Sequence, residues 1–247
     1  MSLPARRSRH HRWGTWWGLL LAAGGVLIGT SAGFWQLGRA AEKRVLEASF
    51  AAGATAPALQ QLVPDGEATA RRYAVLRLTG HYDPDHQVLL DNMSYAGRPG
   101  YQVLTPFETA SGTVLVNRGW VPANGDRRQL PDIRVDGGVR QLVGRIEHLP
   151  RPGILLATGA VPAVEPWPRR LLFPTSAEVS AQLGRPLRGF QLLLDARDPD
   201  GFVRDWHPGG MVAERHVAYA VQWFGLALTV VVIYVVLVVR ANRRQTS

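Results

Sequence analysis

The sequence predicts a membrane protein of the α+β class, in which two transmembrane helices flank a mostly β exported domain with one or two short helices. Uncharged apolar runs cover residues 13–38 and 217–239, and each exceeds the roughly 20 residues that a helix needs to cross a bilayer. Between these runs, short strand-like segments alternate with turn-forming residues. Residues 39–215 are therefore expected to lie on one side of the membrane.

The two tails predict which side that is. Residues 1–12 contain four arginines, residues 240–247 contain three, and neither tail contains an acid. Because arginine-rich short flanks stay in the cytoplasm, both termini are expected inside and residues 39–215 outside. In a bacterium, this places the protein in the inner membrane and the central domain in the periplasm. The alternative is a cleaved signal peptide, but the first run is longer than the usual apolar core of roughly 7–15 residues.

The formal net charge of +9 does not indicate a nucleic-acid partner. Seven of the 28 Lys and Arg residues lie in the tails, which leaves 21 bases against all 19 acids in residues 39–215. A nucleic-acid-binding domain would need a basic face, whereas basic tails favour anionic lipid of the bilayer. The chain has no Cys and only three Met, so neither thiolate chemistry nor a soft copper site is expected. The spacing of the histidines predicts no metal site.

The first apolar run carries a stripe of small residues. Gly25, Gly29 and Gly33 are four positions apart, so they share one face of a helix spanning residues 13–38. Such a stripe lets another helix approach closely, and the second span (residues 216–239) or a helix of a partner would fit. Residues 39–53 are rich in helix formers and are expected to continue this helix or to form a short interfacial one.

The central domain is expected to contain several strands and a capped helix. Pro106 is expected to end its strand or to lie at a sheet edge, and residues 97–100 are expected to form a turn. Thr175 and Glu178 fit a capping box at a helix start, and Gly184 is placed to end that helix. The expected strands are residues 73–82, 86–93, 101–108, 113–121, 139–148 and 190–195.

The start of the second span carries the residues most suited to binding a cofactor. His216, Tyr219 and Trp223 fall along one stripe of a helix, with the small Ala220 between them. Histidine is a common axial ligand of haem, and aromatic neighbours suit a flat macrocycle. Alternatively, Tyr and Trp anchor the helix at the membrane interface and the histidine only reaches toward water. Gln222 is a further candidate, because polar groups inside spans are often functional.

Asn117, Arg118, Gly119 and Trp120 form an unusual group at the end of a predicted strand. Arg118 is expected either to bind a carboxylate such as a propionate or to pair with an acid inside the domain. Patterns of catalysis are missing: the chain has no GxSxG elbow, no Walker-type phosphate loop and no HExxH. An enzyme is therefore not expected.

Five segments of the sequence form a pattern when taken together: residues 34–39 (FWQLGR), 80–82 (GHY), 98–101 (RPGY), 114–121 (VLVNRGWV) and 216–224 (HVAYAVQWF). This set resembles the Surfeit locus protein one family. The resemblance covers both spans and most of the loop, in the same order, although residues 155–167 match nothing in the pattern. Trp35, Gln36, Arg39, Gly100 and Tyr101, with the group at 117–120, would then be partner-binding or structural positions.

The resemblance implies a role in cytochrome c oxidase assembly. Such a protein would assist the insertion of haem a into the core subunit, or stabilise that subunit, without catalytic turnover. Its partners would be the core subunit and haem a synthase, and His216 would contact haem. The family pattern has Asn before this histidine, whereas this chain has Glu214 and Arg215 there. The alternatives are a membrane-tethered scaffold that never contacts haem, and an exported enzyme such as a hydrolase.

Overall fold

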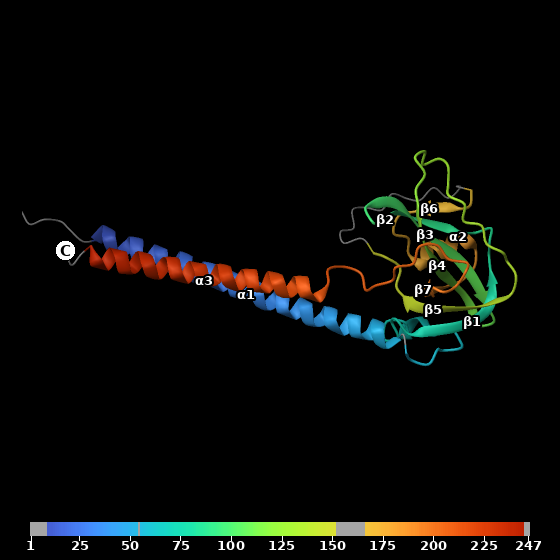
Figure 1. The fold of residues 1–247 in the computed structure, drawn as a ribbon, viewed down its shortest axis with the longest axis horizontal. Coiled ribbons are helices and arrows are strands. Elements are labelled where there is room, and N and C mark those ends of the chain that lie inside the picture. The colour runs from blue at the N-terminus through green and yellow to red at the C-terminus, as the bar shows by residue number, and fades with distance from the viewer. Residues whose placement is uncertain (1–8, 54, 152–165, 245–247) are drawn as a thin grey trace, which may run out of the picture. The chain divides into compact units, whose positions relative to one another are not determined.

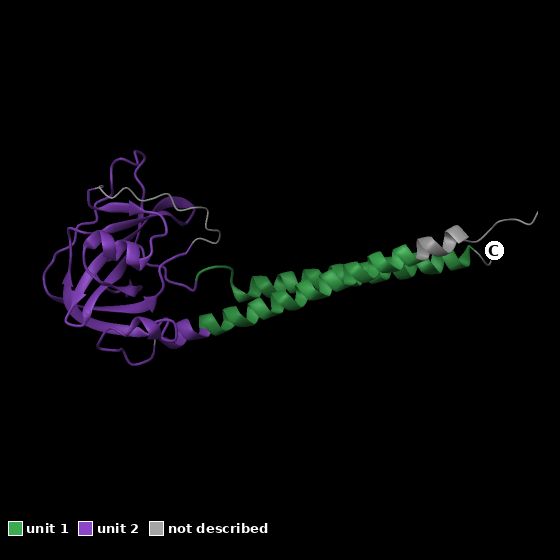
Figure 2. Cartoon of the chain, turned by 180° about the vertical axis from the view of Figure 1, so that it is seen from behind, with its two compact units in different colours: residues 1–47, 209–247 green, residues 48–208 purple. Residues whose placement is uncertain are grey.

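The computed structural model describes residues 9–53, 55–151 and 166–244. The chain forms two compact units, one made of residues up to 47 together with those from 209 onward, and the other of residues 48–208 (Figure 2). The first unit consists mainly of the long helices α1 (Arg9–Gly53) and α3 (Ala213–Arg243), whereas the second contains all the strands. Two long helices thus flank a β-rich domain, as predicted.

Both long helices are long and apolar enough to cross a membrane, by length and composition. Helix α1 runs without interruption through residues 39–53, so the first of the two expectations for that segment is correct. Helix α3 ends at Arg243, with two arginines in its last turn, where positive side chains interact favourably with the helix dipole.

The strands of the second unit form one sheet that closes on itself. Its order is β1-β5-β7-β4-β3-β2-β6, and β1 also pairs with β3, so that β1, β5, β7, β4 and β3 form a ring (Figure 1). Strands β2 and β6 continue the sheet beyond β3. The strands are β1 (Val75–Tyr82), β2 (Val88–Tyr95), β3 (Arg98–Thr109), β4 (Gly112–Pro122), β5 (Arg140–Glu147), β6 (Arg169–Leu171) and β7 (Leu187–Leu194).

Side chains that alternate between buried and exposed along the strands fill the interior of the barrel. Leu76 and Leu78 of β1 point inward and meet Leu142 of β5 and Phe190 of β7 in the main core cluster. Burying each such side chain stabilises the fold by about 1.5–3 kcal/mol relative to leaving it exposed. A second cluster lies where β2 and β3 meet α2 (Ser176–Leu183), and it includes Val179. The short helix η1 (Asp65–Glu67) precedes the barrel.

The predicted short elements are largely confirmed. Each of the six predicted strands is present, with ends within three residues of the predicted ones, whereas the short β6 was not predicted. Thr175 caps α2 by accepting a hydrogen bond from the Glu178 N–H, and the Glu178 carboxylate accepts one from the Thr175 N–H. Gly184 ends the helix with φ +68°.

The strand end expected at Pro106 is not found there, and the turn expected at residues 97–100 begins earlier. Strand β3 does not end at Pro106 but continues to Thr109, because Pro106 lies where the neighbour of β3 changes from β2 to β1. No ladder hydrogen bond from its nitrogen is needed there, and its carbonyl accepts one from the Asp83 N–H at 2.9 Å. Arg98 already begins β3, so the turn lies before it, where Ala96 and Gly97 have positive φ.

Candidate functional site

Helices α1 and α3 meet along a seam of small residues, within the first unit. Gly25, Gly29 and Gly33 lie on the face of α1 that meets α3. A Cβ atom added at Gly29 would lie 3.0 Å from the Ala227 Cβ and 3.1 Å from the Trp223 carbonyl oxygen. The two backbones are therefore so close that this face of α1 has no room for larger side chains.

The seam continues toward the C-terminal part of α1. On α3, Ala213, Ala220 and Ala227 are buried and are seven positions apart, the repeat of helices that wind around each other. Where α3 begins, the Ala213 N–H donates to a Glu47 carboxylate oxygen of α1 at 3.4 Å. Lys43 of α1 donates to the Gly209 carbonyl just before α3. Sequence reasoning missed Lys43 and Glu47. Their only signal was their position three and seven residues after Ala40, a small residue of α1 that is buried.

His216 forms a hydrogen bond across this seam. It is the fourth residue of α3, and its Nδ1 lies 2.7 Å from Oε1 of Gln36 on α1. An amide oxygen can only accept, so Nδ1 donates to it. In a neutral ring, Nε2 is then left as the acceptor with its lone pair available. The hydrogen-bond partner of His216 thus comes from the opposite helix rather than from its chain neighbours Glu214 and Arg215.

The other candidates around His216 are not gathered into a buried pocket with it. Tyr219 is 42% exposed and Gln222 is exposed, whereas His216 and Trp223 are half-buried. The reason is geometric: successive residues turn by about 100° around a helix. Ala220 therefore takes the seam position between His216 and Trp223, and Tyr219 lies beside the seam.

Near the α1 end of this hydrogen bond, the aromatic side chains face outward. Trp35 is 61% exposed, and the Phe34 ring packs edge-on against Phe224 of α3 with centroids 5.3 Å apart. Arg39 forms an exposed ion pair with Glu42 of the same helix. Trp35, Phe34 and Arg39 thus lie near Gln36 in the chain. Among the described residues, the hydrogen bond to the His216 ring comes from Gln36 and not from these three.

The group Asn117–Trp120 of β4 lies inside the domain. Asn117 is fully buried, and its amide donates to Oε1 of Gln102 and of Gln191, on the two strands that flank β4. Its Oδ1 accepts a hydrogen bond from the Gly119 N–H. Asn117 therefore joins three adjacent strands at this point of the barrel.

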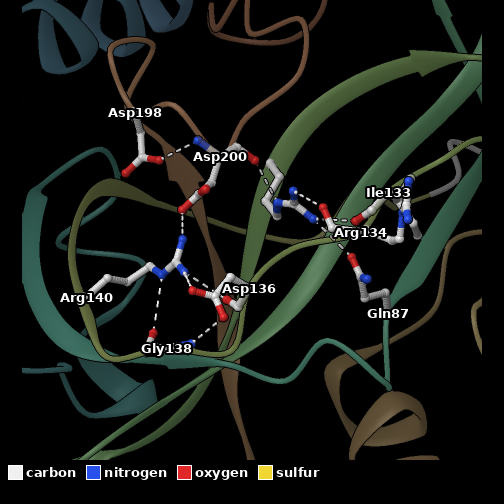
Figure 3. Close-up of polar contacts among 9 residues, drawn as sticks. Gln87, Ile133, Arg134, Asp136, Gly138, Arg140, Asp198 and Asp200 are labelled. Atoms are coloured by element: carbon white, nitrogen blue, oxygen red, sulfur yellow. Dashed lines mark hydrogen bonds and ion pairs between the residues drawn. The ribbon is translucent and has the colours of Figure 1, made fainter.

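Arg118 forms no ion pair with an acid among the described residues, so the expected internal ion pair is not found, while binding of a carboxylate ligand stays a prediction. The residue is 2% exposed, and its guanidinium donates to the carbonyl oxygens of Asp200, Ile133 and Arg134 and to Oε1 of Gln87; these four acceptor residues are labelled in Figure 3. Three main-chain carbonyl oxygens and one amide oxygen thus accept from the guanidinium in place of a carboxylate. Burial lowers the pKa of Arg118 from its usual value.

Gly119 and Trp120 hold the chain that follows β7. The N–H of Trp120 donates to the Val203 carbonyl, and the Val203 N–H donates back to the Trp120 carbonyl. Gly119 has φ +111°, and a Cβ there would lie 2.6 Å from the Val203 oxygen. The indole N–H of Trp120 donates to the Met93 carbonyl at 2.9 Å.

Gly100 and Tyr101 complete this packing. A Cβ at Gly100 would collide with the Val121 carbonyl and the ring of Trp120, so only glycine fits. Tyr101 is buried against Leu89 and Val121. The central motif residues therefore have structural roles in the barrel, which distinguishes them from His216 and Gln36.

Ion pairs connect several turns of the β domain. Figure 3 shows Arg140 between Asp136 and Asp200, with which it forms ion pairs. Asp83 accepts from the His86 ring at 2.8 Å and pairs with Arg185. Burial raises the pKa of Asp83, but the hydrogen bond and charge of His86 and the charge of Arg185 outweigh this and hold the pKa below its usual value.

The histidines of the β domain have separate neighbours. His81 lies 3.3 Å from a Glu108 oxygen, and His148 lies 3.3 Å from the Thr69 hydroxyl. Within residues 9–53, 55–151 and 166–244, no group of three or more His, Cys, Asp or Glu residues is arranged to hold a metal ion.

Comparisons with known proteins cover nearly the whole chain. A family model described as the SURF1 family matches residues 24–228, which include Gln36, Arg118 and His216. The chain is 30% identical over 215 residues to a SURF1-like protein of Rickettsia conorii, covering 83% of this chain and 85% of that protein. It is 27% identical over 225 residues to an uncharacterised SURF1-like protein of Mycobacterium tuberculosis, covering 86% and 80% respectively. A SURF1-like protein of Monosiga brevicollis is 25% identical over 244 residues, covering 91% and 87%.

Proposed function

This chain belongs to the SURF1 family, and on that basis we propose that it is an assembly factor for cytochrome c oxidase. It assists the insertion of haem a into the core subunit, or stabilises that subunit, and it acts without catalytic turnover. Helices α1 and α3 span the inner membrane of a bacterium, both termini are cytoplasmic, and the β domain is periplasmic. The partners are the oxidase core subunit and haem a synthase.

The hydrogen bond between His216 and Gln36 is the observation that supports a haem contact most directly. Because Nδ1 donates to Gln36 Oε1 at 2.7 Å, a neutral imidazole has its Nε2 lone pair free. Axial histidines typically have this arrangement, in which the second nitrogen is held by an outer hydrogen-bond acceptor. His216 is only half-buried, so Nε2 is accessible from outside the helix pair.

The residues near His216 fit a large apolar ligand at the surface of the helix pair. Trp223 lies two turns further along α3 and is half-buried, and Tyr219 exposes 42% of its surface. Haem a would supply the iron that accepts the imidazole lone pair. His216 orients this lone pair, Gln36 fixes the ring, and the aromatic side chains exclude water from one side.

The outward position of Tyr219 and Gln222 favours a second candidate function. Side chains that point away from the α1–α3 seam are available to a helix of a partner, so the protein would act as a membrane-tethered scaffold that never contacts haem. The two candidates differ in one respect, namely whether haem co-purifies with the protein.

A visible absorption spectrum of the protein tests the proposal. The full-length chain is purified in a neutral detergent from cells that make haem a, alongside His216→Ala and Gln222→Ala. We expect haem in the wild type and in Gln222→Ala, with a clear loss in His216→Ala at unchanged protein yield. Equal haem content in all three proteins would remove the ligand assignment, and lack of haem in all of them, with oxidase assembly still dependent on the protein, would favour the scaffold.

The proposed topology has its own test. The seven tail arginines, with no acids, support cytoplasmic termini. A reporter that is active only in the cytoplasm should be active when fused at Ser247, whereas a reporter that requires export should be silent there. The reverse pattern would contradict the topology without bearing on the family.

A further inference from the structure

A groove of about 710 Å³ lies on the outer face of the barrel, over strands β1, β5 and β7. This volume is in the range of roughly 300–1,000 Å³ that small-molecule sites occupy. Its floor includes Val75 and Arg77 of β1 and Val143 and Arg145 of β5. None of these residues belongs to the helix seam or to the β4 motif.

The strand register brings two arginines of the floor together. Val75 pairs with Arg145 and Arg77 pairs with Val143, so the two arginines are diagonal neighbours on the same face of the sheet. Such neighbours are separated by about 7–8 Å between Cα atoms, within reach of long side chains. Two like charges at this separation repel each other, and an anion between them would remove the repulsion.

The arginines of the groove have no ion-pair partner in the described part of the chain. Arg77 is exposed, and neither it, Arg145 nor Arg197 forms a salt bridge there. Arg145 donates from Nη1 to the Phe50 carbonyl at 2.7 Å, which leaves its other N–H groups available. The groove thus contains arginine N–H groups that are not hydrogen-bonded to acceptors among the described residues of the protein.

Three acids line the groove with the arginines, namely Asp195, Asp198 and Asp205, and the first two are engaged with the main chain. The Asp195 carboxylate accepts a hydrogen bond from the Arg197 N–H at 2.9 Å, and the Asp198 carboxylate accepts one from the Asp200 N–H at 3.0 Å. These acids stabilise the turn that follows β7. They form no ion pair with Arg77 or Arg145 among the described residues.

The groove is also lined by two aromatic side chains and by small alanines. Phe50, in the last turn of α1, lies with its ring 4.4 Å from the Arg145 guanidinium. Trp206 also lines the groove, and its indole N–H donates to the Leu194 carbonyl at 2.7 Å, so the indole has no free polar atom. Ala56 and Ala58 leave room between the floor and the walls.

We propose that this groove binds a small amphiphile that carries a carboxylate or phosphate group. The anionic group lies between Arg77 and Arg145, which offer paired N–H donors suited to planar or tetrahedral oxyanions. The apolar body contacts Phe50 and Trp206. A tetrapyrrole with propionate groups and an acidic lipid share this chemistry. The site is independent of His216 and of the proposed function.

Binding of iron-free probes to the full-length protein tests this. In neutral detergent, tryptophan fluorescence is titrated with protoporphyrin, its dimethyl ester, dodecyl phosphate and inorganic phosphate. Because none of these contains iron, ligation by His216 does not contribute. We expect saturable binding of protoporphyrin, dodecyl phosphate or both, and at least tenfold weaker binding of the dimethyl ester.

Two groove variants and a matched control define the site. Arg77→Gln should weaken binding about tenfold, the effect of losing one charge-assisted hydrogen bond. Ala196→Trp should block the groove while keeping its charges. Arg98→Gln, an exposed arginine of β3 outside the groove, should leave binding unchanged.

The results distinguish the two possible classes of ligand and define when the proposal fails. Binding of protoporphyrin alone identifies a tetrapyrrole, and binding of dodecyl phosphate alone identifies an acidic lipid; each supports the proposal if Arg77→Gln weakens it. The proposal is overturned if no probe binds saturably, if Arg77→Gln binds as the wild type does, or if inorganic phosphate binds as tightly as the amphiphiles. Equal thermal unfolding of Arg77→Gln and Arg98→Gln verifies that both variants are folded.

Discussion

Nδ1 of His216 and Oε1 of Gln36 lie 2.7 Å apart, although 180 positions separate these residues in the chain. The bond joins α1 to α3 and fixes which imidazole nitrogen carries the proton. Gln36 thereby orients the imidazole, and a change at Gln36 is expected to alter the position of Nε2.

Replacing Gln36 should affect haem more than stability. Gln36→Leu removes the acceptor and frees the ring to rotate, so haem affinity should fall by about tenfold or more, the usual effect of losing an outer hydrogen bond to a metal-ligating histidine. Gln36→Glu keeps an acceptor and should retain haem. The measurement is haem content per protein together with the position of the main absorption band. Gln222→Leu, on an exposed part of α3, is the control. Unchanged haem in Gln36→Leu would contradict this role.

Bulk on the α1 seam should separate the helices. Gly29→Leu places side-chain atoms where the Ala227 Cβ and the Trp223 carbonyl already lie, and overpacking of this kind costs about 1–3 kcal/mol. Gly24→Leu is a matched control because nothing lies within 4 Å of a Cβ there. Thermal unfolding in neutral detergent and the oxidase level in cells should both decrease for Gly29→Leu alone. Equal melting temperatures and equal oxidase levels in the two variants would show that close packing at Gly29 contributes to neither stability nor assembly.

The buried arginine of β4 should be intolerant of lysine. Arg118→Lys replaces a planar group with five donors by one ammonium, so several of the four acceptors around it lose their partner. The free energy of unfolding should fall by about 2–4 kcal/mol. Arg134→Lys, whose side chain is 90% exposed, should change it by less than about 0.5 kcal/mol. Denaturant unfolding of the full-length protein measures both, and a tolerated Arg118→Lys would contradict the network in Figure 3.

Gly119 should not tolerate a side chain. At φ +111°, alanine is strained by about 1–3 kcal/mol, and its Cβ would press against the Val203 carbonyl. Gly119→Ala should therefore loosen the chain around residue 203, which amide hydrogen exchange at Val203 would detect as faster exchange. Gly125→Ala, where nothing lies within 4 Å, is the comparison and should exchange as the wild type does.

Acid should weaken the turn between β1 and β2. The pKa of Asp83 is lower in the folded protein than in the unfolded chain, so this carboxylate contributes stability above its unfolded pKa of about 4. The contribution is lost as pH falls from about 4 through the lower folded value. Asp83→Asn should thus lower the melting temperature at pH 6 and converge toward the wild type below about pH 4. Asp85→Asn, an exposed neighbour, is the control and should keep the wild-type melting temperature at pH 6.

The sequence predicted the elements better than their arrangement. Local signals were sufficient for the capping box at Thr175 and for the strands, because alternation and turn residues act over a few positions. The ring closure between β1 and β3 could not be predicted, since it depends on pairs such as Gly80 with Thr109 that no local pattern specifies. β6 has only three residues, too few for a periodicity.

The same limit applies to the candidate site. The spacing of Gly25, Gly29 and Gly33 predicted a packing face, but only the structure identifies α3 as the helix that lies against it. Spacing likewise placed Tyr219 beside His216, yet the partner of the imidazole is Gln36, which belongs to another helix. For Arg118, the residue type predicted an anionic partner, whereas burial among carbonyl groups provides neutral acceptors.

The α1–α3 seam also sets an order of events during synthesis. Its two sides are made about 180 residues apart, and at roughly 5–20 residues per second α3 emerges about 10–40 seconds after the glycine face of α1. Throughout that interval, Gly25, Gly29 and Gly33 have no partner helix from their own chain, while the whole barrel is being made. A newly made chain therefore presents this face to lipid, to chaperones or to other helices before it can close on itself, and every truncation that precedes α3 leaves it open.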